Sequence, residues 1–274
     1  MKYIFDNDLH IHSKLSFCSK DPEQTPERIL EYAKQNNLKT VCITDHFWDE
    51  LVEGASQGYK SYNYTYISSS KPLPQADGIE FLFGCETDLN KYLTLGISKE
   101  RFDLFDFIIV SITHFHMMGF TLFDNEAESA QGRADAWIRR LDALLDMDLP
   151  FYKIGLAHLT TPLISPKRDK DIYRKILELL PAFELERLFN KAAQLGVGIE
   201  LNYGDMSFEE EDAEFVLKPY RIAKKCGCKF YLGSDAHHPD VFYNAKAVFE
   251  RAINLLELTE EDKFFVCGRS MHGL

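Results

Sequence analysis

The sequence predicts a parallel α/β barrel. Short apolar runs of strand length alternate with amphipathic runs of helical length along the whole chain, which is typical of parallel strands covered by helices. The chain has 274 residues, close to the roughly 250 residues of such a barrel. Polar residues follow the ends of most expected strands, which favours a barrel over an open doubly wound sheet, the alternative that alternation alone leaves open. Because no linker or low-complexity stretch interrupts the pattern, we expect a single domain over residues 1–274.

The opening strand is expected to begin with the apolar residues 3–5 and to end at His12. A helix should follow from Pro26 to about residue 36, because Thr25 suits the N-cap and proline suits the first helical position. Further strands are expected over residues 40–44, 81–85, 107–112, 153–157, 198–201 and 229–233. Further helices are expected over residues 134–147, 170–180, 183–195, 213–226 and 245–256. Gly196 is a C-cap signal for the helix that ends at residue 195.

Residues 47–79 form a long connection that glycines and prolines break up, with one or two helical turns expected around residues 64–71. Long connections in compact domains are commonly functional lids or partly disordered. The aromatic side chains of this segment either cap a substrate or pack beneath a surface loop; they include Trp48, Tyr59, Tyr62 and Tyr64.

Charge and composition exclude several classes of protein. The formal net charge is −12, with 43 acidic against 31 basic residues, which argues against binding to a nucleic-acid backbone. The sequence has neither a signal-peptide pattern nor an apolar run near the roughly 20 residues that span a bilayer, so we expect no membrane partner. The six cysteines show neither zinc-knuckle pairs nor a disulfide framework, and a cytoplasmic location is expected.

Histidines and carboxylates occupy the ends of the expected strands. In a parallel barrel these ends open on one face, where catalytic groups are normally found. Taken singly, each such histidine could be structural, but together they predict one pocket. Their number exceeds what one tetrahedral ion needs, which implies two or three divalent ions. The residues at or just past the strand ends are His10, His12, His46, Glu86, His114, His158, Asp235 and His237.

The motifs around these residues resemble those of the PHP (polymerase and histidinol phosphatase) superfamily, in the family's order and over almost the whole chain. They are Asp8-Leu9-His10-Ile11-His12, Thr44-Asp45-His46, Gly84-Cys85-Glu86, Thr113-His114, Ala157-His158 and Gly233-Ser234-Asp235-Ala236-His237. The closest resemblance is to the stand-alone histidinol-phosphatase-like branch. It implies a distorted seven-stranded (β/α)7 TIM-like barrel with a three-metal cluster.

The resemblance also implies how the ligands divide. The first ion would be held by His10, His12, Glu86 and Asp235; the second by Glu86, His114 and His158; the third by His46 and His237. The family places a histidine or aspartate where this chain has Cys18. A cysteine thiolate can bind zinc, so Cys18 is either the last ligand of the third ion or a free thiol. Zinc, iron and manganese all suit this set. Asp45 could orient a ligand histidine through its second nitrogen.

The activity that the resemblance implies is hydrolysis of a small phosphorylated metabolite, best matched by L-histidinol phosphate, through attack of a hydroxide that bridges the metal ions. Arg168 is expected to contact the phosphate. His116 and His238 either line the substrate site, support the ligands, or have a plain structural role. Two alternatives stay open: a phosphodiesterase or exonuclease of the same superfamily, and a non-catalytic barrel that binds metal or a partner.

Overall fold

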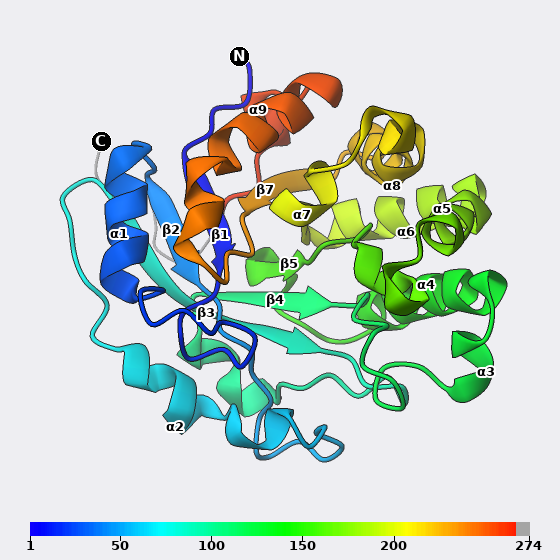
Figure 1. Ribbon diagram of the computed structural model, residues 1–274, viewed down its shortest axis with the longest axis horizontal. Coiled ribbons are helices and arrows are strands. Elements are labelled where there is room, and N and C mark those ends of the chain that lie inside the picture. Colours follow the sequence, from blue (N-terminus) through cyan, green and yellow to red (C-terminus); the bar gives the residue numbers. More distant parts are fainter. Residues whose placement is uncertain (267–274) are drawn as a thin grey trace.

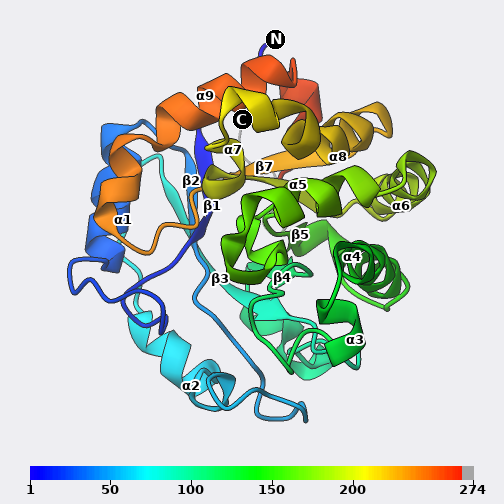
Figure 2. The same cartoon turned by 45° about the vertical axis from the view of Figure 1, so that its right-hand side comes forward.

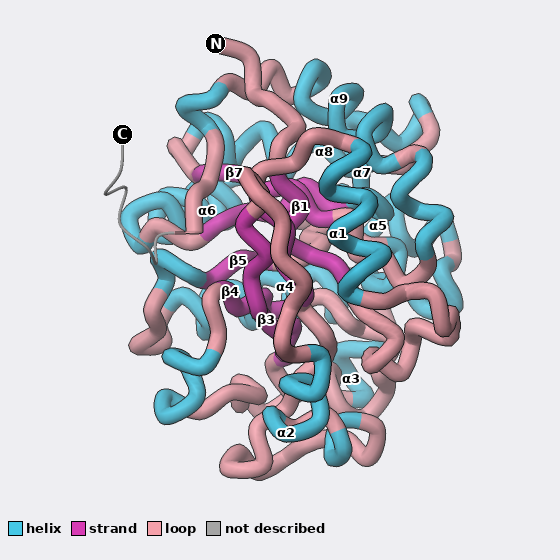
Figure 3. The backbone as a smooth tube through the Cα atoms, turned by 90° about the vertical axis from the view of Figure 1, so that its left-hand side faces the viewer, coloured by secondary structure: helices cyan, strands magenta, loops and turns pink. Residues whose placement is uncertain are grey.

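The structure is a computed structural model that describes residues 1–266; the end of the expected domain, residues 267–274, lies outside the described residues. Seven parallel strands form one sheet in the order β1 to β7. The sheet curls into a nearly closed barrel at the centre of the molecule (Figure 3), so the predicted fold class is confirmed. The strands are β1 (Asn7–Ile11), β2 (Thr40–Ile43), β3 (Glu80–Asp88), β4 (Phe107–Ser111), β5 (Ile154–Leu156), β6 (Gly198–Asn202) and β7 (Lys229–Gly233).

Helices cover the outside of the barrel. Figures 1 and 2 show α1, α9, α8, α6 and α4 around the strands, with α2 apart from them at the lower edge. All predicted helices are present within a few residues, Thr25 caps the first, and Gly196 ends another with φ of 77°. In residues 1–266, no helix is long and apolar enough to cross a bilayer. The helices are α1 (Pro26–Gln35), α2 (Tyr64–Ile67), α3 (Asp124–Ala127), α4 (Ala130–Leu145), α5 (Lys170–Leu179), α6 (Ala182–Leu195), α7 (Tyr203–Met206), α8 (Ala213–Lys225) and α9 (Ala245–Leu255).

The seam between β1 and β7 closes the ring. At its upper end, the His12 backbone N–H donates to the Ala236 carbonyl at 3.1 Å, and the Asp235 N–H donates to the His10 carbonyl at 2.7 Å. At the N-terminal end of β1, the Asn7 side chain takes the place of a backbone acceptor and accepts a hydrogen bond from the Leu232 N–H at 3.2 Å. The first and last strands, which both carry candidate ligands, are therefore held side by side.

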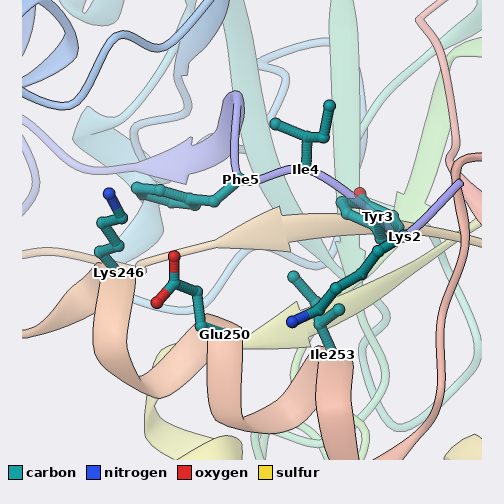
Figure 4. A pocket seen from close by; sticks show the side chains of 7 residues that line it. All are labelled: Lys2, Tyr3, Ile4, Phe5, Lys246, Glu250 and Ile253. Carbon is teal, nitrogen blue, oxygen red and sulfur yellow. The ribbon is translucent and has the colours of Figure 1, made fainter.

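The expectation that residues 3–5 open the first strand is wrong. These residues run past α9 (Figure 4), where Phe5 packs on Phe249 with ring centroids 5.6 Å apart. The backbone N–H of Tyr3 donates to the Leu258 carbonyl at 3.1 Å instead of to a strand. Burial of the apolar run against a helix therefore replaces strand pairing, and β1 begins at Asn7.

The inner face of the barrel changes from apolar to polar along each strand. A small core cluster fills the lower interior with residues that include Leu82, Phe107 and Tyr231, and Phe264 of the C-terminal segment joins it from below. Side chains two apart share a face of a strand, so on β3 the apolar Leu82 is followed on that face by Glu86 and Asp88. The polar ends of the strands therefore lie above a packed apolar interior.

Candidate metal centre

An open cavity of about 560 Å³ lies at the C-terminal ends of the strands. The long connection of residues 47–79 reaches it through Tyr59, whose side chain is buried. Trp48 of the same connection is buried against Tyr59 with ring centroids 5.9 Å apart. Of the four predicted aromatic residues, Tyr59 thus lines the cavity and Trp48 packs behind it; that the connection caps a substrate stays a prediction.

The two histidines of β1 point to the same place. Their Nε2 atoms lie 3.2 Å apart, and the Oδ1 atom of Asp235 lies 3.1 Å from Nε2 of His12. Glu86 sends Oε2 toward this pair, 3.4 Å from His12 Nε2 and 3.6 Å from His10 Nε2. These four side chains are the ones expected to hold a first ion.

The other oxygen of Glu86 faces a second group. Its Oε1 atom lies 3.0 Å from Nε2 of His158 and 3.7 Å from Nε2 of His114. A ligand atom from each of these three residues falls within 4.8 Å of the others. Glu86 therefore lies between two ligand groups, and the bridging role that the family resemblance implies for it stays a prediction.

A third group consists of His12, His46 and His237, whose ligand atoms also lie within 4.8 Å of one another. The ring of His12 stacks on that of His237 at 4.1 Å between centroids. Cys18 lines the cavity and is exposed, but it belongs to none of the three ligand groups found among residues 1–266. Its role as a ligand stays a prediction.

Hydrogen bonds behind the first group select the tautomer of its histidines. Nδ1 of His10 lies 2.7 Å from Oε1 of Glu200, which can only accept, so this nitrogen carries the proton. Nδ1 of His12 lies 2.9 Å from the Ser16 hydroxyl, which itself donates to Asp45. Asp45 thus reaches His12 through Ser16 instead of touching a ligand ring. In the neutral rings, both Nε2 atoms therefore face the centre with a lone pair.

The second group follows the same pattern. Nδ1 of His114 donates to the carboxylate of Asp88 at 3.0 Å. Nδ1 of His158 donates to the Thr113 hydroxyl at 2.9 Å, because that hydroxyl gives its own hydrogen to the His158 carbonyl. Outer partners of this kind are usual around metal-binding histidines, since they fix the ring and its tautomer.

The electrostatics of the centre call for positive charge. Burial disfavours the charged form of Glu86, but the imidazoles of His46, His10 and His114 outweigh it and hold its pKa well below the usual value. Burial also opposes charging of His158, yet Glu86 raises the pKa of this histidine to about 9. Imidazole nitrogens and carboxylates converge here, with no lysine or arginine in the three ligand groups found among residues 1–266. Such a set suits divalent cations, so the residues fit the implied metal ions.

Two candidate ligands have backbone conformations that are unusual for residues with a side chain. His158 has φ of 28° and Asp235 has φ of 50°, both in the left-handed region, which costs of order 1–3 kcal/mol. Such strain persists where neighbouring contacts fix it, and it concentrates at functional sites. The strand ends are therefore shaped to aim these side chains at the centre.

The predicted substrate contacts lie in different places. Arg168 and His116 both line the cavity. His238 lies outside that lining, half-exposed, with Nε2 2.6 Å from an oxygen of Asp21. Asp88 and Glu200 were not predicted as site residues. Each had a signal in the sequence, because Glu200 is the one acid within its buried strand and Asp88 follows Glu86 on the same strand face.

Fold and centre together define a class: a (β/α)7 barrel whose strand ends carry a nitrogen- and carboxylate-rich centre for divalent metal ions. The chain belongs to the PHP domain family, because the family model matches residues 8–204. The match includes the ligand candidates from His10 to His158, while Asp235 and His237 lie beyond it.

Similar proteins agree with this membership. A curated relative named "Probable phosphatase", from Caldicellulosiruptor saccharolyticus, is 22% identical over 233 residues, 84% of this chain and 79% of the relative. The histidinol phosphate phosphatase of Lactococcus lactis, solved with zinc, L-histidinol and phosphate, superposes with a TM-score of 0.53 at 17% identity, over 90% of this chain and 93% of its own. A candidate histidinol phosphatase from Listeria monocytogenes gives 0.59 at 12% identity, over 89% and 99%. At these identities the solved structures show the shared fold.

Proposed function

We propose that this protein is a metal-dependent phosphatase that hydrolyses a small phosphomonoester, with L-histidinol phosphate as its substrate. The observation that carries the proposal is the cluster of imidazole nitrogens around the buried Glu86, at the floor of an open cavity. Family membership and the phosphatase names of its relatives support hydrolysis of a phosphoric monoester. The substrate named for the Lactococcus lactis protein supports the choice of L-histidinol phosphate.

In this proposal the three ligand groups hold two or three divalent ions, zinc, iron or manganese. Bound there, the ions would activate water at neutral pH and neutralise charge on the phosphate oxygens. We assign the first ion to His10, His12, Glu86 and Asp235, the second to Glu86, His114 and His158, and the third to His46 and His237 with Cys18 as a further donor.

The cavity wall supplies what the ions do not. Arg168 lines the cavity, and its guanidinium would pair with phosphate oxygens, as arginine does through two parallel hydrogen bonds. Burial and the neighbouring His114 lower the pKa of His116 to about 4, so this ring is neutral at pH 7 and serves as a hydrogen-bond partner. Phe17 and Leu163 give the wall apolar surface for the leaving group.

Phosphate release with metal-replete protein tests the proposal. The protein should release phosphate from p-nitrophenyl phosphate and, faster, from L-histidinol phosphate in the presence of zinc, manganese or iron. The matched variant His12→Ala should lose this activity, because it removes a nitrogen shared by two ligand groups. If the replete protein and the variant both release no phosphate, the proposal is wrong. Faster cleavage of a short oligonucleotide would favour the phosphodiesterase alternative instead.

A further inference from the structure

We infer that Glu200 is a positioning residue that serves the first and second metal groups at once. Its side chain is fully buried in the middle of β6. One carboxylate oxygen contacts the ring of His10 and the other contacts the backbone of His158. The inference rests on the proposed metal sites, but it does not depend on which substrate the enzyme hydrolyses.

The first oxygen selects the tautomer of His10. Oε1 of Glu200 lies 2.7 Å from Nδ1 of His10 and, as a carboxylate oxygen, can only accept. In the neutral ring the proton therefore sits on Nδ1, and Nε2 keeps the lone pair that points at His12 and Glu86. A histidine in the opposite tautomer would present an N–H to the ion and could not bind it.

The second oxygen fixes the turn that carries His158. Oε2 of Glu200 accepts the backbone N–H of His158 at 2.6 Å. This residue has φ of 28°, and its carbonyl is held by the Thr113 hydroxyl at 3.1 Å. The left-handed conformation is thus clamped on both sides, and one of the two clamps is the same carboxylate that orients His10.

The neighbouring strand is built around this carboxylate. A Cβ atom on Gly233 of β7 would lie 1.9 Å from Oε1 of Glu200 and 2.7 Å from the Cβ atom of His10. No side chain fits there without displacing one of them. The position of Glu200 therefore requires glycine at position 233. A substitution of Gly233 would displace the Glu200 carboxylate, which offers a second way to disturb its contact with His10.

Glu200→Gln separates the two contacts, because an amide has one accepting oxygen and one donating nitrogen. The His158 N–H can only donate, so the amide oxygen stays with it. The amide nitrogen then faces Nδ1 of His10 and needs a lone pair there, which moves the ring proton to Nε2. The variant should keep the His158 turn and the fold while removing His10 from the first ligand group.

The experiment is a zinc titration of the metal-free protein against a competing chelator, for wild type, Glu200→Gln, His10→Ala and the double variant. Loss of an outer partner typically lowers metal affinity about 10- to 100-fold, and we expect this loss at one zinc site in Glu200→Gln. In the His10→Ala background the same substitution should add little, since its effect passes through His10. Asp88→Asn is the matched control: it acts through His114 and should lower affinity equally in both backgrounds.

Circular dichroism and thermal unfolding of the metal-free proteins check that Glu200→Gln folds like wild type. Gly233→Ala should weaken zinc binding in the same way without altering the carboxylate itself. Wild-type zinc affinity in Glu200→Gln would overturn the inference, as would an equal loss in the His10→Ala background. Because zinc binding is the readout, a protein that binds zinc as expected but releases no phosphate would contradict the proposed function and leave the role of Glu200 intact.

Discussion

Arg140 of α4 is a buried cation that ties together the ends of two ligand-bearing strands. Its side chain is fully buried. The guanidinium donates to four backbone carbonyls: Leu89 at 2.8 Å, Asn90 at 3.2 Å, Ile112 at 2.7 Å and Thr121 at 2.9 Å. Two of these carbonyls follow β3 and one follows β4. Arg140→Met would keep the volume of the side chain but leave all four carbonyls without this donor.

The size of the effect follows from these contacts. Each hydrogen bond to a charged group contributes about 1.5–3 kcal/mol, and burying the cation costs several kcal/mol in return. The substitution should therefore lower the free energy of unfolding by about 3–5 kcal/mol, as is usual when a buried charged network is broken. At about 2–4 °C per kcal/mol for a domain of this size, the Tm of the metal-free protein should fall by roughly 6–20 °C.

Arg139→Met, the same substitution one residue earlier, is the matched control. Arg139 pairs with Glu126 at 2.7 Å but is about one-third exposed, and such a pair contributes less than about 1 kcal/mol. Differential scanning calorimetry of both variants in chelator compares them directly. If Arg140→Met unfolds at the same temperature as Arg139→Met, the reasoning about the four carbonyls is refuted.

Three other predictions test separate parts of the molecule. Burial raises the pKa of Asp205 to about 6, so this group makes the wild-type protein less stable as pH rises from about 4 to 6. The variant Asp205→Asn should therefore be more stable than wild type above pH 6, by on the order of 2 kcal/mol. Denaturant unfolding should show this gain at pH 7 and no gain at pH 4. Arg168→Ala should lower kcat/KM about 10- to 100-fold, whereas Lys167→Ala, outside the cavity lining, should not; equal effects would count against a phosphate contact. Cys18→Ser should reduce the zinc bound per chain by one at limiting zinc, and an unchanged zinc content would remove Cys18 from the ligands.

The barrel and the strand-end cluster were predictable because the strands are short apolar runs, and six of the seven expected strands carry a residue able to bind metal at or just past their ends. The exception is β6, which ends at Asn202. His10, His114 and His158 could be placed on one face from strand direction alone. The limits of some strands were not predictable in this way. β3 continues past Glu86 to Asp88, since polar side chains on the inner face remain buried within the centre.

The supporting residues escaped the sequence argument for a different reason. Glu200 and Asp88 act through hydrogen bonds to residues 190 and 26 positions away, at His10 and His114, and no local pattern encodes such partners. Residues 3–5 have the composition of a strand, and only the packing of Phe5 against α9 shows that they are not one. Tertiary contacts thus decided what local pattern left open.

The central claim is that the strand-end cluster holds divalent ions that hydrolysis of a phosphomonoester requires. The most direct test follows phosphate release from L-histidinol phosphate while zinc is added stepwise to chelator-treated protein and the bound zinc is measured in each sample. We expect no release without zinc and a rate that rises as the ligand groups fill, to a maximum at two to three ions per chain. Release that is unaffected by chelation, or less than one ion bound per chain at saturating zinc, would contradict the central claim.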